Sequence, residues 1–71
     1  MKSPLIPVRD IQPGQQFDYH GARYVRATED ESHRHPAREL QDARPQIVLV
    51  YMLGKKRTPS SFLPDVAVMP R

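Results

Sequence analysis

The feature of this sequence that most constrains the fold is the run Gln46–Leu53, which reads QIVLVYML. The run is almost continuously apolar and rich in β-branched residues, and Pro45 and Gly54 stand on either side of it. A short apolar run between residues that interrupt regular structure favours a β-strand buried on both faces over a helix. We therefore expect this segment to be the central strand of a β-sheet.

A β-hairpin is predicted around the dipeptide His20-Gly21, because a two-residue loop that ends in glycine suits a hairpin turn. This register places Phe17 opposite Tyr24 on one face and Asp18 opposite Arg23 on the other. Cross-strand aromatic pairs and opposite-charge pairs each stabilise a ladder by about 0.2 to 1 kcal/mol. Both faces of the hairpin therefore agree with a single register.

The remaining segments are shorter or more polar. Pro59 within residues 58–62 predicts an edge strand, because proline cannot donate to a ladder. Residues 66–69 are expected to form the closing strand. Residues 29–45 are polar, and we expect a flexible polar loop there, in which residues 37–43 could form a short helix.

Together these segments predict a mainly β fold of about five strands. A chain of 71 residues buries only about 60% of its unfolded surface, and sheets this small protect their edges by curling. We expect a small SH3-like or OB-like curled antiparallel sheet or barrel, in a single β domain over residues 11–71. Because Pro4 and Pro7 favour extended backbone, residues 1–10 are expected to form an extended N-terminal arm.

The histidine, serine and glycine residues of this chain do not follow the spacings of known catalytic, metal-binding or phosphate-binding motifs. His33 and His35 stand two apart, with His20 elsewhere, and no further ligands follow at a convincing spacing, so we expect no metal site. Ser32 lies beside His33, but adjacency in sequence does not make a nucleophile–base pair. The three glycines fall at turns and not in a phosphate-binding loop. We expect neither enzymatic activity nor a cofactor.

The composition indicates a protein that binds another macromolecule. The formal net charge is +3, from 11 Lys and Arg against 8 Asp and Glu, which suits either a protein or a nucleic-acid partner. The chain has no cysteine and no apolar run long enough for a signal peptide or a membrane span. We therefore expect a cytoplasmic protein that does not bind membranes and is monomeric when free.

One candidate binding segment is the N-terminal arm. The arm is apolar, and its extended backbone could dock on a partner at little entropic cost. The mixed charges of residues 29–44 also suit approach to a protein better than to an anionic duplex. The alternative is that the arm is the first strand of the sheet. If the arm is separate, a chain lacking residues 1–9 should still fold but lose its partner. The candidate contact residues are Ser3, Pro4, Leu5, Ile6, Pro7, Val8 and Arg9.

A second candidate surface is basic and favours nucleic acid. Lys55, Lys56 and Arg57 form a tight turn that could contact phosphates together with Arg23 and Arg26. Aromatic side chains of the hairpin could stack on bases, but the chain has only two phenylalanines and three tyrosines, and its core needs most of them. A third possibility is self-association through an exposed sheet edge.

The order of these segments resembles that of small phage-encoded proteins. The shared frame is Val8-Arg-Asp-Ile11-x-Pro13-Gly14-x-x-Phe17-x-x-x-Gly21-x-x-Tyr24, ending in Val66-x-Val68-x-Pro70. In length, proline-bearing arm and basic turn, the chain is similar to transcription regulators of lytic Xanthomonas phages. That resemblance implies binding to host RNA polymerase, inhibition of initiation and antitermination, with Ser3 to Arg9 at the polymerase contact. The polar insert at 29–45 departs from the pattern and has no role in it.

Overall fold

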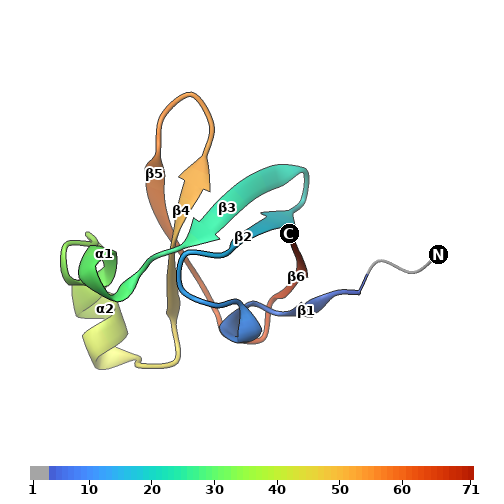
Figure 1. Ribbon diagram of the computed structural model, residues 1–71. Coiled ribbons are helices and arrows are strands. Elements are labelled where there is room, and N and C mark those ends of the chain that lie inside the picture. Colours follow the sequence, from blue (N-terminus) through green and yellow to red (C-terminus); the bar gives the residue numbers. More distant parts are fainter. Residues whose placement is uncertain (1–3) are drawn as a thin grey trace.

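The computed structural model describes residues 4–71, and in this part of the chain six antiparallel strands form one sheet (Figure 1). The strand order is β1-β6-β2-β3-β4-β5. The strands are β1 (Ile6–Pro7), β2 (Gln16–Tyr19), β3 (Ala22–Arg26), β4 (Val48–Leu53), β5 (Thr58–Phe62) and β6 (Ala67–Pro70). The helical segments are the 3-10 turn η1 (Val8–Asp10), α1 (Glu29–His33) and α2 (Arg38–Ala43).

The predicted mainly β class is confirmed, although the sheet has six strands in residues 4–71 where about five were expected. Strands β2 to β5 form a simple meander, and β6 returns to pair with β2. A meander favours the SH3-like alternative, because an OB-like sheet is a Greek key. The sheet does not close into a barrel, since β1 and β5 remain its two edges.

The β2–β3 hairpin has the predicted register. Phe17 pairs with Tyr24, and Asp18 pairs with Arg23. His20 and Gly21 form the turn with φ angles of 49° and 79°, and two positive φ angles in succession are what a type I′ turn requires. The prediction from the His20-Gly21 dipeptide is therefore confirmed.

The sheet is curled so strongly that its edge strand β5 reaches β2. The rings of Phe62 on β5 and Tyr19 on β2 lie 5.0 Å apart between centroids, edge to face. Strands β4 and β3 separate these two strands, and in a flat sheet three strand spacings would hold them about 14 Å apart. Phe17 fills the space between the strands and stacks on Tyr24 at 5.5 Å.

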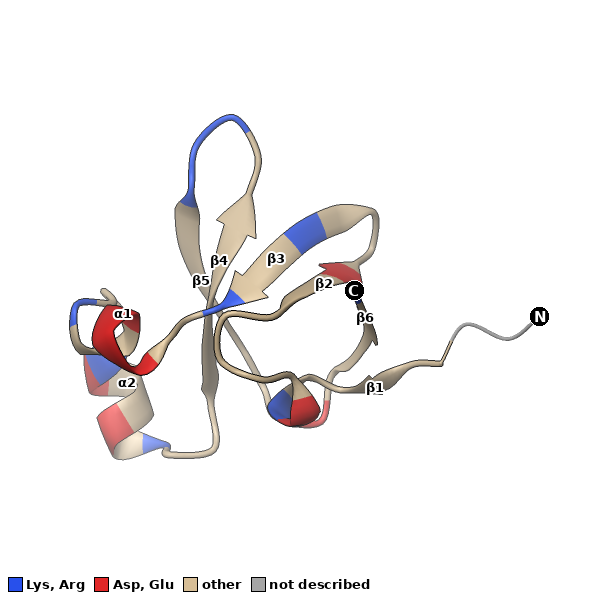
Figure 2. Ribbon diagram, in the orientation of Figure 1, with Lys and Arg blue, Asp and Glu red and all other residues tan. Residues whose placement is uncertain are grey.

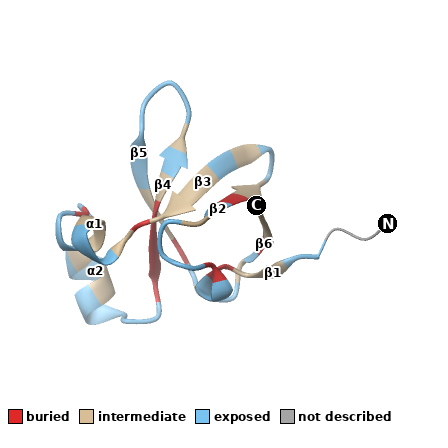
Figure 3. Ribbon diagram, in the orientation of Figure 1, coloured by how far each residue is buried: buried red, intermediate tan, exposed pale blue. Residues whose placement is uncertain are grey.

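The first half of strand β4 is buried (Figure 3). Its side chains contribute to two separate cores, as its unbroken apolar pattern predicts. Val48 and Val50 face the main core inside the curl, and Leu49 faces a smaller core under the helices. As expected, β4 is an internal strand, paired with β3 on one side and β5 on the other, although it stands next to the edge and not at the middle of the strand order. The main core consists of Val8, Ile11, Phe17, Val48, Val50, Phe62 and Val68.

The polar segment 29–45 contains two short helices. Helix α1 begins with a capping box, in which the Thr28 hydroxyl accepts from the Glu31 N–H at 3.3 Å and the Glu31 carboxylate accepts from the Thr28 N–H at 2.9 Å. Helix α2 lies within residues 37–43, where a helix was considered. Buried His35 fastens the segment to the sheet, since its Nε2 lies 2.8 Å from the Val50 carbonyl.

The N-terminal segment belongs to the sheet from Ile6 onward. Ile6 pairs with Val68 across β1 and β6, and the Val8 N–H donates to the Val66 carbonyl at 2.8 Å. The Val8 side chain is 0% exposed. Of the arm expected over residues 1–10, the part after Leu5 is therefore the first strand and a 3-10 turn, which is the alternative left open above.

Candidate binding surfaces

One exposed apolar group outside the core lies at the outer end of β1. Leu5 is 59% exposed, although the strand that follows it is held by β6. It borders a hollow of about 310 Å³ whose other walls include Tyr19, His20 and Met69 from β2, the hairpin turn and β6. We call these four residues the Leu5 groove. Tyr19 is half-buried, and its ring contacts that of His20 at 4.3 Å.

The predicted contact residues of the arm differ in how far their side chains are exposed. Pro4 and Leu5 are exposed, whereas Ile6 and Pro7 are half-buried in β1. Val8 lies in the core and cannot contact a partner, and the exposed Arg9 forms an ion pair with Asp65. Ser3 lies outside the described residues. The structure therefore leaves the outer end of the segment free.

The basic turn at residues 54–57, between β4 and β5, projects from the body of the domain (Figure 2). Lys55 and Lys56 are exposed there. Arg57 is turned toward α1, where it pairs with Glu31 and lies over the Tyr51 ring, 4.3 Å from its centroid. The Thr28 N–H and the Arg57 guanidinium together hold the pKa of Glu31 below its usual value. Two of the three predicted cations therefore remain free of an ion pair in the described residues.

The aromatic side chains considered as stacking platforms belong to the interior cluster. Phe17 is 0% exposed. Tyr24 and Tyr19 are half-buried and surround the Phe62 ring, each with a centroid 5.0 Å from it. The parts of these rings that pack together are not available for stacking on bases. Arg23 is also engaged, since its Nε lies 3.8 Å from the Asp18 carboxylate.

The side chains considered for metal binding and catalysis are occupied by local contacts. His35 Nδ1 accepts from the Ala37 N–H at 3.0 Å, so the proton of the neutral ring lies on Nε2 and is donated to Val50. The Ser32 hydroxyl donates to the Glu29 carbonyl at 2.7 Å. Residues 4–71 contain no group of three His, Cys, Asp or Glu side chains placed to hold a metal ion. The absence of enzymatic activity stays a prediction.

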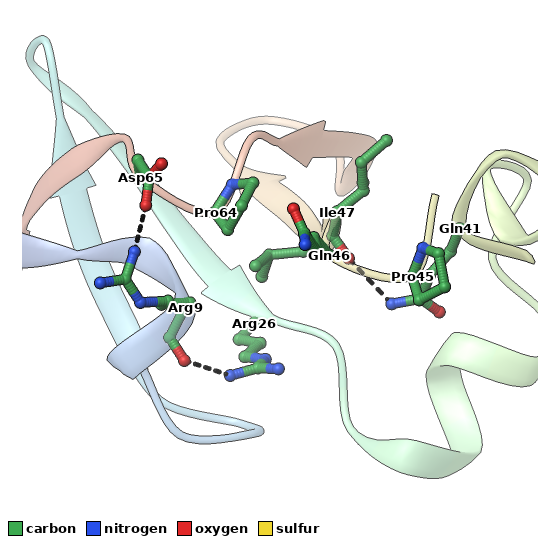
Figure 4. A pocket seen from close by; sticks show the side chains of 9 residues that line it. Arg9, Arg26, Gln41, Pro45, Gln46, Ile47, Pro64 and Asp65 are labelled. Carbon is green, nitrogen blue, oxygen red and sulfur yellow. Dashed lines mark hydrogen bonds and ion pairs between the residues drawn. The ribbon is translucent and has the colours of Figure 1, made fainter. Parts of the chain in front are cut away.

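A larger cleft that the sequence did not indicate lies between η1, the start of β4 and the β5–β6 turn (Figure 4). Its volume is about 610 Å³. Arg26 and Arg9 line it together with Ile47, Pro64 and Asp65. We call it the Arg26 cleft. Its lining residues come from segments far apart in the chain, so no local motif could have revealed it.

Three surfaces are thus candidates for binding: the Leu5 groove, the basic turn and the Arg26 cleft. No helix in the described part of the chain is long and apolar enough to cross a membrane. No family model matches the chain, and no curated protein or solved structure is similar enough to count as a match.

Proposed function

We propose that this protein binds another protein through the Leu5 groove and acts by occupying its partner's surface, without chemistry. The observation that carries the proposal is the 59% exposure of Leu5 at the end of a strand that is fixed by β6. A large apolar side chain held on ordered backbone loses little entropy on binding and can serve as an interface anchor. The half-buried Tyr19 and Met69 would supply the surrounding apolar contact.

The partner that we propose is bacterial RNA polymerase. Support comes from the similarity of the hairpin frame to small phage-encoded proteins, and of the length, arm and basic turn to phage regulators of the Xanthomonas type. Binding by occupancy would inhibit initiation and could allow elongation past terminators, as that resemblance implies. The charges of the domain suit a protein surface, because acidic α1 and the basic turn place both signs on one molecule (Figure 2).

Replacing Leu5 with glutamate is expected to weaken association with RNA polymerase at least about 30-fold, since interface anchors contribute about 2 kcal/mol or more. The measurement is biolayer interferometry of the full chain on immobilised Xanthomonas RNA polymerase. The matched control is Leu40→Glu on α2, where the leucine is 46% exposed and lies outside the Leu5 groove. Circular dichroism would verify that both variants are folded.

Two results would count against this proposal. Equal affinity of Leu5→Glu and the unaltered chain for polymerase would exclude the Leu5 groove as the contact. Absence of binding by the unaltered chain at micromolar concentration would exclude RNA polymerase as the partner.

A second candidate function is nucleic-acid binding, which the projecting and unpaired Lys55 and Lys56 favour (Figure 2). Because Arg57 is held by Glu31, we expect about two phosphate contacts, which correspond to a slope near −1.8 for duplex DNA in a plot of log K against log salt. Reversing both lysines to glutamate should then abolish binding in a fluorescence anisotropy titration. No binding to DNA or RNA at low salt would remove this candidate.

A further inference from the structure

We propose that the Arg26 cleft binds an acidic side chain beside an apolar residue in an extended segment of the partner protein. This inference rests on the proposed function only in taking the partner to be a protein. It gives that partner a second contact besides the Leu5 groove. The cleft is formed by β3, η1 and the turns before β4 and β6 (Figure 4). Strand β3 and the 3-10 turn η1 carry its two arginines, Arg26 and Arg9.

Arg26 is held in place without being neutralised. Its Nη1 donates to the carbonyls of Ile11 and Arg9, the latter at 3.2 Å. Carbonyl groups fix the guanidinium but carry no charge, so its full positive charge stays available. Two arginines in residues 4–71 are half-buried, Arg26 and Arg38. Arg38 forms an ion pair with Asp42 at 3.4 Å, whereas the Arg26 guanidinium has no carboxylate within 4.0 Å. A guanidinium already oriented and partly desolvated binds a carboxylate well.

The second arginine of the cleft is occupied by a partner that is easily displaced. Arg9 pairs with Asp65, whose side chain is 86% exposed. Surface pairs of this kind contribute only about 0.2 to 1 kcal/mol. An incoming carboxylate bound to Arg26 could replace Asp65 on Arg9 and so contact both guanidinium groups.

The charge balance favours a single carboxylate over phosphate. Two arginines and one aspartate line the cleft, which leaves an excess of one positive charge. A dianionic phosphate would be repelled by the Asp65 carboxylate, and its two negative charges would face a net charge of only +1 in the cleft.

The position of the apolar residue follows from a neighbouring hollow of about 400 Å³ that shares Pro45, Gln46, Ile47 and Pro64 with the Arg26 cleft. Arg44 and Leu63 also border this hollow, and Leu63 is 60% exposed. An apolar side chain next to the carboxylate would cover Leu63 and Pro64. The two hollows together therefore select an acidic residue beside an apolar one.

The test is a titration of the isotope-labelled full chain with a blocked peptide, Ser-Gly-Glu-Leu-Gly, followed by NMR. Both ends of the peptide are capped, so its only carboxylate is the glutamate side chain. We expect shift changes centred on Arg26, Ile47 and Leu63, and binding at least about tenfold weaker for the Gln-Leu counterpart, because charged hydrogen bonds contribute about 1.5 to 3 kcal/mol.

Three substitutions sharpen the test, of which the first two are a matched pair. Asp65→Asn should tighten peptide binding about twofold to fivefold, because it frees Arg9. Asp42→Asn makes the same charge change in an exposed pair on α2 and should leave the affinity unchanged. Arg26→Gln should weaken binding at least about tenfold, with circular dichroism to verify folding.

The inference is overturned by equal binding of the Gln-Leu peptide, by no change or weaker binding in Asp65→Asn, or by no binding at millimolar peptide. Shift changes confined to the basic turn would also overturn it. Because the peptide titration contains no polymerase, its outcome is independent of the test at Leu5.

Discussion

A chain that lacks residues 1–9 is expected to be unfolded under conditions in which the full-length chain is folded. The deletion removes β1, the fully buried Val8 side chain and the hydrogen bond from Val8 to Val66. A buried valine contributes about 1.5 to 3 kcal/mol, and the lost ladder and Ile6 contacts bring the total to about 4 to 6 kcal/mol. A domain of this size has only about 4 to 10 kcal/mol of stability. Far-UV circular dichroism and urea unfolding would measure the effect.

This expectation reverses the one drawn from the sequence, in which the arm was separable from the domain. Two substitutions distinguish the alternatives without shortening the chain. Val8→Asp places an unpaired charge in the core and should also unfold the protein, whereas Leu5→Glu at the exposed end should change stability by less than about 0.5 kcal/mol. A folded, cooperatively unfolding deletion variant would show that β1 and Val8 are dispensable.

Replacing Phe17 with alanine is expected to destabilise the domain by about 3 to 5 kcal/mol. Phe17 is 0% exposed, stacks on Tyr24 at 5.5 Å and meets Phe62 edge to face at 5.7 Å. Its removal would leave a cavity at the place where β5 approaches β2, and the short strands cannot collapse to fill it. The measurement is the free energy of unfolding from urea titration.

The matched variant is Phe17→Leu, which keeps most of the volume and should cost about 1 to 2 kcal/mol. A cost below about 1 kcal/mol for Phe17→Ala would mean that the ring is not the centre of the core. In that case the aromatic residues would again be available for stacking on bases.

The β2–β3 hairpin could be predicted because everything that determines it is local. The turn dipeptide His20-Gly21, the aromatic pair and the charge pair lie within eight residues of one another. Strand β4 was predictable for a similar reason, since its apolar run lies between Pro45 and Gly54. Even the start of α1 carries a local signal, the Thr28-x-x-Glu31 capping box, which the sequence analysis did not use.

The pairing of β1 with β6 could not be read from the sequence in the same way. Ile6 meets Val68 from the opposite end of the chain, and a two-residue strand has no periodicity of its own. The same reason explains the binding surfaces. An exposed Leu5 was foreseeable as part of an apolar arm, but the Arg26 cleft forms only when η1, β3 and the β5–β6 turn meet.

The measurement that tests the central claim most directly is hydroxyl-radical footprinting of the protein, free and in complex with RNA polymerase. We expect Leu5 and Met69 to lose reactivity in the complex, while Leu40 and Met52, which are 46% and 36% exposed, keep theirs. Phe17 should be unreactive in both states. Unchanged reactivity of Leu5 on binding, or oxidation of Phe17 in the free protein, would contradict the claim that this small sheet holds Phe17 in its core and binds through its outer strand.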